Sequence, residues 1–271
     1  MKTVNSLSGG KTSSYMAIHH PADINIFSLV TIEAKYCKPK DRNLVRTVSD
    51  KIGKEFVATA ESDKTIIAML DLEQKLGTEI VWVAGETFEQ LIRRKKALPN
   101  QAWRFCTTEL KLKPIFEYFH KSEIGIVDMR IGIRFDESER VNYLNTTFKT
   151  IVGRSKNGNR NKWGDVYWRE LSYPLVDSRI CHYDVFKWSQ ISEINFPADS
   201  NCVGCFWKNP QQLRKNYDDE PQKMRWFEDM ELLVGQKWKK EMPYESIKDI
   251  GLQMDFQFGT GSGCQSGFCT N

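Results

Sequence analysis

The chain has 271 residues, of which 40% are hydrophobic, and this is enough for one large α/β domain or a domain with an appended segment. Its 39 basic and 35 acidic side chains give a net charge of +4, too balanced to indicate nucleic-acid binding, although a nucleic-acid partner is left open. No apolar run reaches the roughly 18 residues of a membrane helix, and no apolar segment precedes the first glycines, so we expect a cytoplasmic protein with neither a membrane partner nor a secretory signal.

An anion site is predicted near the N-terminus. Residues 4–7 form a short apolar run that predicts a first β-strand, and residues 13–18 read as the opening of a helix. Glycines between them let the backbone approach a ligand, and unpaired N–H groups at the helix start favour negative charge. We expect Lys11 to add a positive charge that also serves catalysis. The predicted phosphate or sulfate contacts are Ser8, Gly9, Gly10, Lys11, Thr12 and Ser13.

Strands and helices then alternate over the first 135 residues. Apolar runs predict further strands at residues 24–32, 79–84 and 124–133. Helical spacing of apolar residues predicts helices at 41–53, 65–76, 87–96 and 111–121. This order predicts an α/β fold with a doubly wound, mostly parallel sheet, in which ligands bind at the carboxyl ends of the strands.

The second half has a different character. Residues 153–164 are basic and rich in glycine and asparagine, and predict an exposed loop or hairpin; a lid or a contact to a polyanion is the functional alternative. Helices are expected at 184–191 and 222–238, whereas residues 256–269 are too glycine-rich for regular structure. We therefore divide the chain into a nucleotide-binding α/β domain, residues 1–195, and a C-terminal metal-binding segment with a flexible tail, residues 196–271.

The cysteines indicate metal binding or catalysis. Seven cysteines in a chain of cytosolic type are more often ligands or nucleophiles than disulfide partners. Cys202-Val-Gly-Cys205 has the spacing of a knuckle for zinc or iron, although a redox dithiol or a pair of buried core cysteines would fit as well. Two thiolates do not complete a site, so further ligands must come from Cys37, Cys106, Cys181, Cys264 or Cys269.

Basic residues cluster at two further places. Arg134 and Arg140 follow a predicted strand among carboxylates, and could form a salt-bridged turn or clamp a phosphate or sulfate between guanidinium forks. Lys111 follows Cys106 at the start of a predicted helix, where a solvated face is the simpler interpretation.

Four blocks in order resemble the phosphoadenosine phosphosulfate reductase family, a branch of the PP-loop adenine-nucleotide α-hydrolase superfamily. The blocks are Ser8–Ser13, Arg104–Pro114, Gly132–Arg140 and Cys202–Cys205, so the resemblance covers roughly residues 1–210. It implies an adenine nucleotide whose phosphate or sulfate end lies on the serine-glycine loop. It also implies anion contacts from Lys111, Arg134 and Arg140.

The resemblance extends to a metal site, with departures. In relatives with a 4Fe–4S cluster, a Cys-Cys pair and a Cys-x-x-Cys supply the ligands. Here Cys106, Cys202 and Cys205 match three of them, and Thr107 replaces the fourth. We assign the fourth position to Cys269, with Cys181 and Cys264 as alternatives and zinc as the alternative metal. The family's C-terminal nucleophile motif is absent, so Cys269 or Cys264 is the expected nucleophile.

Three functions follow from these features. The first is reductive attack of a cysteine on the sulfate of an adenylyl sulfate, with a thioredoxin-like reductant as partner. The second is ATP pyrophosphatase chemistry, in which ATP with Mg²⁺ adenylates an acceptor, such as a nucleic acid, for sulfur transfer. The third is a nucleotide-binding module without activity that has a structural metal site.

Overall fold

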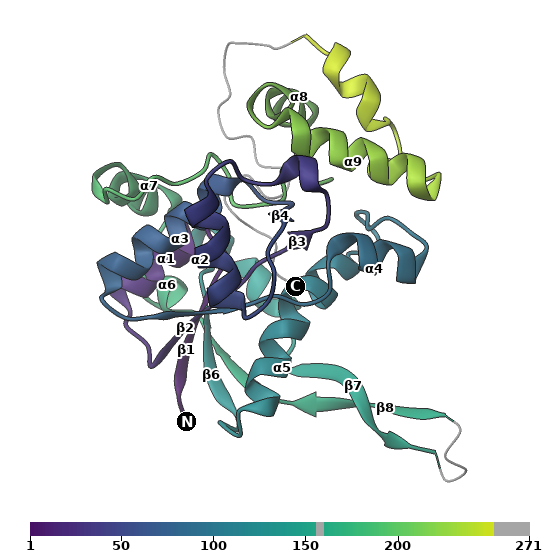
Figure 1. The fold of residues 1–271 in the computed structure, drawn as a ribbon. Helices are drawn as coiled ribbons and strands as arrows, with labels where there is room; N and C mark the ends of the chain where they lie inside the picture. The colour runs from purple at the N-terminus through teal and green to yellow at the C-terminus, as the bar shows by residue number, and fades with distance from the viewer. Residues whose placement is uncertain (156–159, 252–271) are drawn as a thin grey trace.

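A five-stranded sheet forms the centre of the computed structural model, which describes residues 1–155 and 160–251 (Figure 1). Its strands lie in the order β5-β2-β1-β6-β9, and every neighbouring pair is parallel. The strands are β1 (Thr3–Leu7), β2 (Ile24–Ser28), β5 (Ile80–Val83), β6 (Val127–Ile131) and β9 (Arg169–Ser172). The predicted parallel α/β sheet is therefore confirmed.

Helices cover both faces of this sheet. Successive residues of a strand point to opposite faces, so Phe27 packs in one hydrophobic cluster and Ile26 in another. The cluster around Phe27 includes residues of α1 (Lys11–His19), α2 (Arg42–Ile52) and α3 (Asp63–Leu76). The cluster around Ile26 includes Phe116 of α5 (Lys113–Lys121). This arrangement is compatible with a doubly wound fold.

Local signals set the helix ends. The Asp41 side chain accepts hydrogen bonds from the backbone N–H groups of Asn43 and Leu44 and so starts α2, as expected of an N-cap. Thr87 and Gln90 form a capping box at the start of α4 (Phe88–Lys95). A glycine in the left-handed conformation ends α2 at Gly53.

A third hydrophobic cluster brings the two halves of the chain together. It contains Val30, Phe88 and Leu91 from the first half and the fully buried Trp226 and Tyr244 from the second. The elements around it are β3 (Thr31–Ile32), β4 (Ala58–Thr59), α4, α8 (Pro210–Asp219) and α9 (Pro221–Val234). The C-terminal segment therefore shares a core with the α/β half, and the domain boundary near residue 195 stays a prediction.

Several elements differ from the sequence-based expectation. Residues 24–32 form two strands, because β2 ends in the parallel sheet and β3 turns away to pair antiparallel with β4. The helix expected from residue 222 ends at Val234, where Gly235 has a φ of 69°. Neither α8 nor β9 was predicted, since both are short and mostly polar.

The remaining short elements lie mainly in connections. They are the 3₁₀ helices η1 (Lys35–Cys37), η3 (Phe135–Tyr143) and η4 (Tyr244–Asp249), the π-helix η2 (Thr107–Leu112), and the helices α6 (Pro174–Asp177) and α7 (His182–Ile191). No helix in the described ranges has the length and apolarity to cross a membrane.

An antiparallel hairpin extends away from the central sheet (Figure 1). Its strands are β7 (Thr147–Arg154) and β8 (Asn161–Tyr167), so the expectation of a loop or hairpin around residues 153–164 is confirmed as a hairpin. Phe148 stacks on Phe116 of α5 at its base. The glycine-rich tail at residues 256–269 lies outside the described residues.

Gly9 offers a test of the packing between α1 and α3. A Cβ at this position would lie 2.3 Å from Cγ2 of Thr65, and the φ of Gly9 is +77°. We expect Gly9→Ala to lower the free energy of unfolding by about 2–4 kcal/mol in urea denaturation, because overpacking adds to left-handed strain.

Gly53→Ala is the matched control, because Gly53 has a similar φ of +66° and no atom within 4 Å of the added Cβ. It should cost only about 1 kcal/mol. Thr65→Ser removes the clashing methyl group and should restore part of the stability in the Gly9→Ala background. Equal losses in the two glycine variants would contradict this account.

Candidate functional site

The sheet has a topological switch point at β1. The chain builds β2 and β5 on one side of β1, and β6 and β9 on the other. Loops that leave neighbouring strands in opposite directions open a crevice at the carboxyl end of such a sheet. Here the loops after β1 and β6 meet, and they border a cleft of about 450 Å³, a volume that includes the solvent at its mouth. Its lining residues are Gly10, Lys11, Thr12, Arg134, His182, Val185, Phe186, Pro197, Ala198, Asp199 and Ser200.

The serine-glycine loop is held in shape by Ser13. The buried Oγ of Ser13 accepts a hydrogen bond from the Ser8 N–H and donates one to the Gly10 carbonyl, both at 3.1 Å. Ser8 Oγ also lies 3.1 Å from Ser13 Oγ, within hydrogen-bond distance. Ser8 and Ser13 therefore shape the loop, whereas Gly10, Lys11 and Thr12 border the cleft.

Side chains of the protein occupy the space in which Gly9 and Gly10 would carry a Cβ atom. A Cβ on Gly9 would strike Thr65, and a Cβ on Gly10 would lie 2.6 Å from Oγ of Ser200. Close packing thus requires glycine at both positions, in addition to any approach of a ligand. No side chain caps the first turn of α1, so its leading N–H groups have no intrahelical partner and face the loop.

Arg134 lies beside the loop, as predicted, but among carboxylates. Its side chain is 3% exposed, and Nη1 donates to Oγ1 of Thr12 at 3.2 Å. Nε pairs with Asp136 at 3.1 Å and Nη2 with Glu137 at 3.0 Å. Arg140 lies 3.8 Å from the other oxygen of Glu137 and does not line the cleft. The salt-bridged turn, one of the two alternatives given above, is therefore present, and the clamp on a phosphate or sulfate stays a prediction.

The pKa values of two groups in or beside the cleft are shifted by this environment. Burial raises the pKa of Glu137 to about 7, against the opposing effect of Arg134 and Arg140. Burial and then the charge of Arg134 hold the pKa of His182 below its ordinary value. Lys11 Nζ lies 5.9 Å from the ring centre of Phe186, which also lines the cleft. The cleft therefore combines positive charge with restricted solvent, which favours an anionic ligand.

A second pocket contains the predicted metal-ligating cysteines. Cys106, Cys202 and Cys205 all line this pocket of about 380 Å³, together with Arg104 and Lys111. Within residues 1–155 and 160–251, however, no three His, Cys, Asp or Glu side chains are grouped closely enough to hold one ion. The thiols are the donors that zinc and iron–sulfur clusters prefer, so this pocket fits such a group in donor chemistry, and the ligand set stays a prediction.

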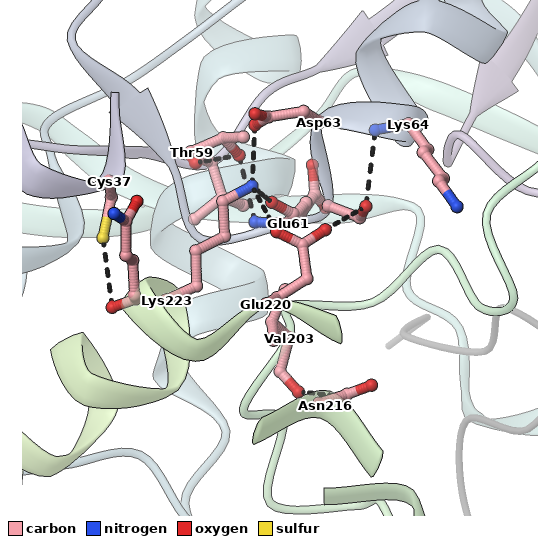
Figure 2. A network of polar contacts seen from close by, with 12 residues as sticks. Cys37, Thr59, Glu61, Asp63, Lys64, Val203, Asn216, Glu220 and Lys223 are labelled. Atoms are coloured by element: carbon pink, nitrogen blue, oxygen red, sulfur yellow. Dashed lines mark hydrogen bonds and ion pairs between the residues drawn. The ribbon is translucent and has the colours of Figure 1, made fainter. Parts of the chain in front are cut away.

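Lys111 lies in this second pocket and not in the cleft where the resemblance implies it. Its Nζ is 2.7 Å from Oε1 of Glu61, whose side chain is wholly buried. Lys223, also buried, donates to the Glu61 carbonyl at 2.5 Å and to Asp63 at 2.7 Å (Figure 2). Of the expected basic anion contacts, Lys11 and Arg134 thus line the cleft, and Lys111 lines the cysteine pocket.

The turn that bears Cys202 and Cys205 is held by its carbonyl groups. The Val203 carbonyl accepts from Asn216 Nδ2 at 2.7 Å (Figure 2). It also accepts from Lys208 Nζ at 3.1 Å. The Gly204 carbonyl accepts from the Tyr244 hydroxyl at 3.0 Å. A Cβ on Gly204 would lie 2.4 Å from the Phe227 ring, so the glycine between the cysteines is required by packing. These donors therefore fix the backbone of the turn that carries both thiols.

The two pockets adjoin along one stretch of chain. Asp199 and Ser200 line the cleft, and Cys202 and Cys205 line the second pocket. Asp199 pairs with Lys208 at 2.8 Å, and the same Nζ donates to the Val203 carbonyl. The sequence pattern gave no signal for Ser200 or for this connection, because both depend on the tertiary path of the chain.

The other cysteines occupy different places. Cys37 is buried and its Sγ donates to the Gln222 carbonyl at 3.4 Å, while burial raises the pKa of the thiol to about 12. Cys181 precedes α7 and adjoins His182 of the cleft, and it does not line the cysteine pocket. Cys264 and Cys269, the expected nucleophiles and further ligands, lie outside the described residues.

Comparison with known proteins identifies no relative: no family model, curated protein or solved structure matches the chain. The resemblance to the phosphoadenosine phosphosulfate reductase family therefore rests on the four sequence blocks.

Glu137 predicts a pH dependence of stability. Because its pKa in the folded protein is raised above the ordinary glutamate value to about 7, the folded chain holds an extra proton at mildly acidic pH. The free energy of unfolding should therefore fall as pH rises from about 5 to 7, by on the order of 2 kcal/mol from this group. Urea denaturation of Glu137→Gln at both pH values should lack this component.

The exposed Glu139, two residues away, supplies the control. Glu139→Gln should keep the slope of the parent protein. A Glu137→Gln variant with the parent slope would show that the carboxylate titrates in its ordinary range.

Proposed function

We propose that this protein is an enzyme of PP-loop type that binds an adenine nucleotide in the cleft at the switch point and uses it in sulfur chemistry. The observation that carries the proposal is the cleft itself. It combines the N-terminus of α1, Lys11 and the buried Arg134 around a loop whose shape depends on Ser13. Such a set of donors suits a phosphate, pyrophosphate or sulfate group.

The favoured reaction is reductive cleavage of an adenylyl sulfate. A cysteine thiolate, Cys264 where Cys269 ligates the metal and Cys269 otherwise, attacks the sulfur atom. An S–S bond forms, the S–O bond to the phosphate breaks, and AMP or its 3′-phosphate leaves with the electron pair. A thioredoxin-like dithiol then releases sulfite and becomes a disulfide. The role of Lys11 and Arg134 is to stabilise the charge that develops on the leaving phosphate.

ATP pyrophosphatase chemistry is the second candidate. In this reaction an acceptor takes the adenylyl group of ATP and pyrophosphate leaves along the loop. Asp199 favours it, because this carboxylate lines the cleft and carboxylates are the usual protein ligands of a phosphate-bound Mg²⁺. The acceptor, a nucleic acid or a small molecule, is left open. A binding module without activity is the remaining outcome.

For the metal we propose an iron–sulfur cluster on Cys106, Cys202, Cys205 and Cys269, with zinc as the alternative. The supporting observation is that the first three share one pocket. A bound cluster would supply charge stabilisation and rigidity beside the cleft. The chain's own residues, Lys111 among them, would orient the cysteines.

Ser13→Ala tests the function. The change removes the hydroxyl that joins Ser8 to Gly10. We expect it to lower turnover by about tenfold or more, whether turnover is measured as sulfite release from adenosine 5′-phosphosulfate or as pyrophosphate release from ATP. Ser246→Ala, on an exposed residue of η4, should leave turnover unchanged.

Cys269→Ser separates the two reactions. Sulfite release abolished by this change supports the reductase, whereas pyrophosphate release that survives it supports the pyrophosphatase. Nucleotide binding with neither product would leave only the binding module, and absence of nucleotide binding would refute the proposal.

Cys202→Ser tests the metal. We expect protein purified without oxygen to be brown if it holds an iron–sulfur cluster, or colourless with one zinc per chain. The serine variant should lose the metal and melt at a lower temperature, since ligation contributes folding free energy. Cys37→Ser is the control, because Cys37 does not line the cysteine pocket. Full metal content in Cys202→Ser would refute the assignment.

A further inference from the structure

Ser200 has a buried hydroxyl that the fold leaves unused. The residue is 3% exposed, and Oγ has no hydrogen-bond partner among the described residues. A buried polar group without a partner costs free energy, and in native proteins such groups often indicate a role outside the fold.

This hydroxyl lies at the start of α1. The Oγ atom would be 2.6 Å from a Cβ on Gly10, so it packs against the backbone at the N-terminus of the helix. Ser200 and Gly10 both line the cleft. The side chain thus approaches the anion site from the C-terminal half of the chain.

The donors near this point suit a ligand with acceptor atoms, and the neighbouring carboxylate of Asp199 is paired with Lys208 at 2.8 Å. Lys11 carries a positive charge, and the helix start presents N–H groups. A serine hydroxyl can donate one hydrogen bond, and rotation about χ1 redirects it without moving the backbone. An anionic oxygen above the loop would therefore satisfy Ser200.

We propose that Ser200 is a ligand-binding residue of the cleft, whose hydroxyl donates a hydrogen bond to a phosphate or sulfate oxygen held at the N-terminus of α1. The inference deepens the proposed function and rests on it. It assigns the recognition of the anionic end of the ligand to two distant segments, the loop after β1 and the segment that leads to Cys202.

Ser200→Ala tests this assignment by two measurements on the full-length protein. Isothermal calorimetry with ATP and with adenosine 5′-phosphosulfate should show binding of at least one probe in the parent and about tenfold weaker binding in the variant, since a hydrogen bond to a charged group is lost. Thermal melting without ligand should show a midpoint equal to or above that of the parent, because the change removes a buried polar group that has no partner.

Ser14→Ala is the matched control. Ser14 lies on α1, is wholly buried and also has an Oγ without a partner among the described residues, but it does not line the cleft. This variant should melt at or above the parent temperature and keep the parent affinity.

Three results would overturn the inference alone. They are parent-like affinity in Ser200→Ala, an equal loss of affinity in both variants, and a lower melting temperature of ligand-free Ser200→Ala, which would reveal a structural partner. If the parent protein binds neither probe, the proposed function and this inference fall together.

Discussion

The contacts of the buried residue Glu61 hold the second half of the chain in position against the first. The Glu61 carboxylate accepts from Lys111 at 2.7 Å, its backbone carbonyl accepts from Lys223, and its backbone bridges to Cys202. Three segments far apart in the chain thus converge on one residue beside β4, and Figure 2 shows one of them, Lys223, next to Glu61. Because an unbalanced buried charge costs several kcal/mol, on the order of 3–5, these segments keep their relative positions only while the pairs stay intact.

This convergence explains why the cysteine pocket and the anion cleft lie close together. The chain lines the cleft at Ser200 and pairs with Glu61 at Cys202. It then forms a turn whose carbonyl groups accept hydrogen bonds from Lys208, Asn216 and Tyr244. A ligand in the cleft and a group on the thiols would therefore contact opposite ends of one short, buried segment. The proposed chemistry needs such proximity between a nucleotide and reactive sulfur.

Sequence patterns predicted the parallel sheet and most helices, because alternation and capping are local signals; Asp41 and Thr87 start helices as the patterns indicate. They also indicated which cysteines share a pocket, through the resemblance. They gave no indication that Lys111 pairs with Glu61 and lines the cysteine pocket, since a residue type in a pattern does not reveal its tertiary partner. Ser200 gave no signal at all, because only the tertiary path of the chain brings it to Gly10.

The π-helix η2 has a consequence for how this site could arise or be lost. In an α-helix, residues five apart differ by about 140° around the axis, so Cys106 and Lys111 would face different directions. The wider i→i+5 turn brings both side chains to one pocket. A π turn differs from an α turn by a single inserted residue. Deletion of one of residues 107–110 would close the π turn to an α turn and leave the cysteine and the lysine four residues apart, about 40° around the axis, so both would still face one side. An α-helix of unchanged length would instead turn the cysteine away from the lysine, so in this segment the backbone conformation, as well as residue identity, encodes the site.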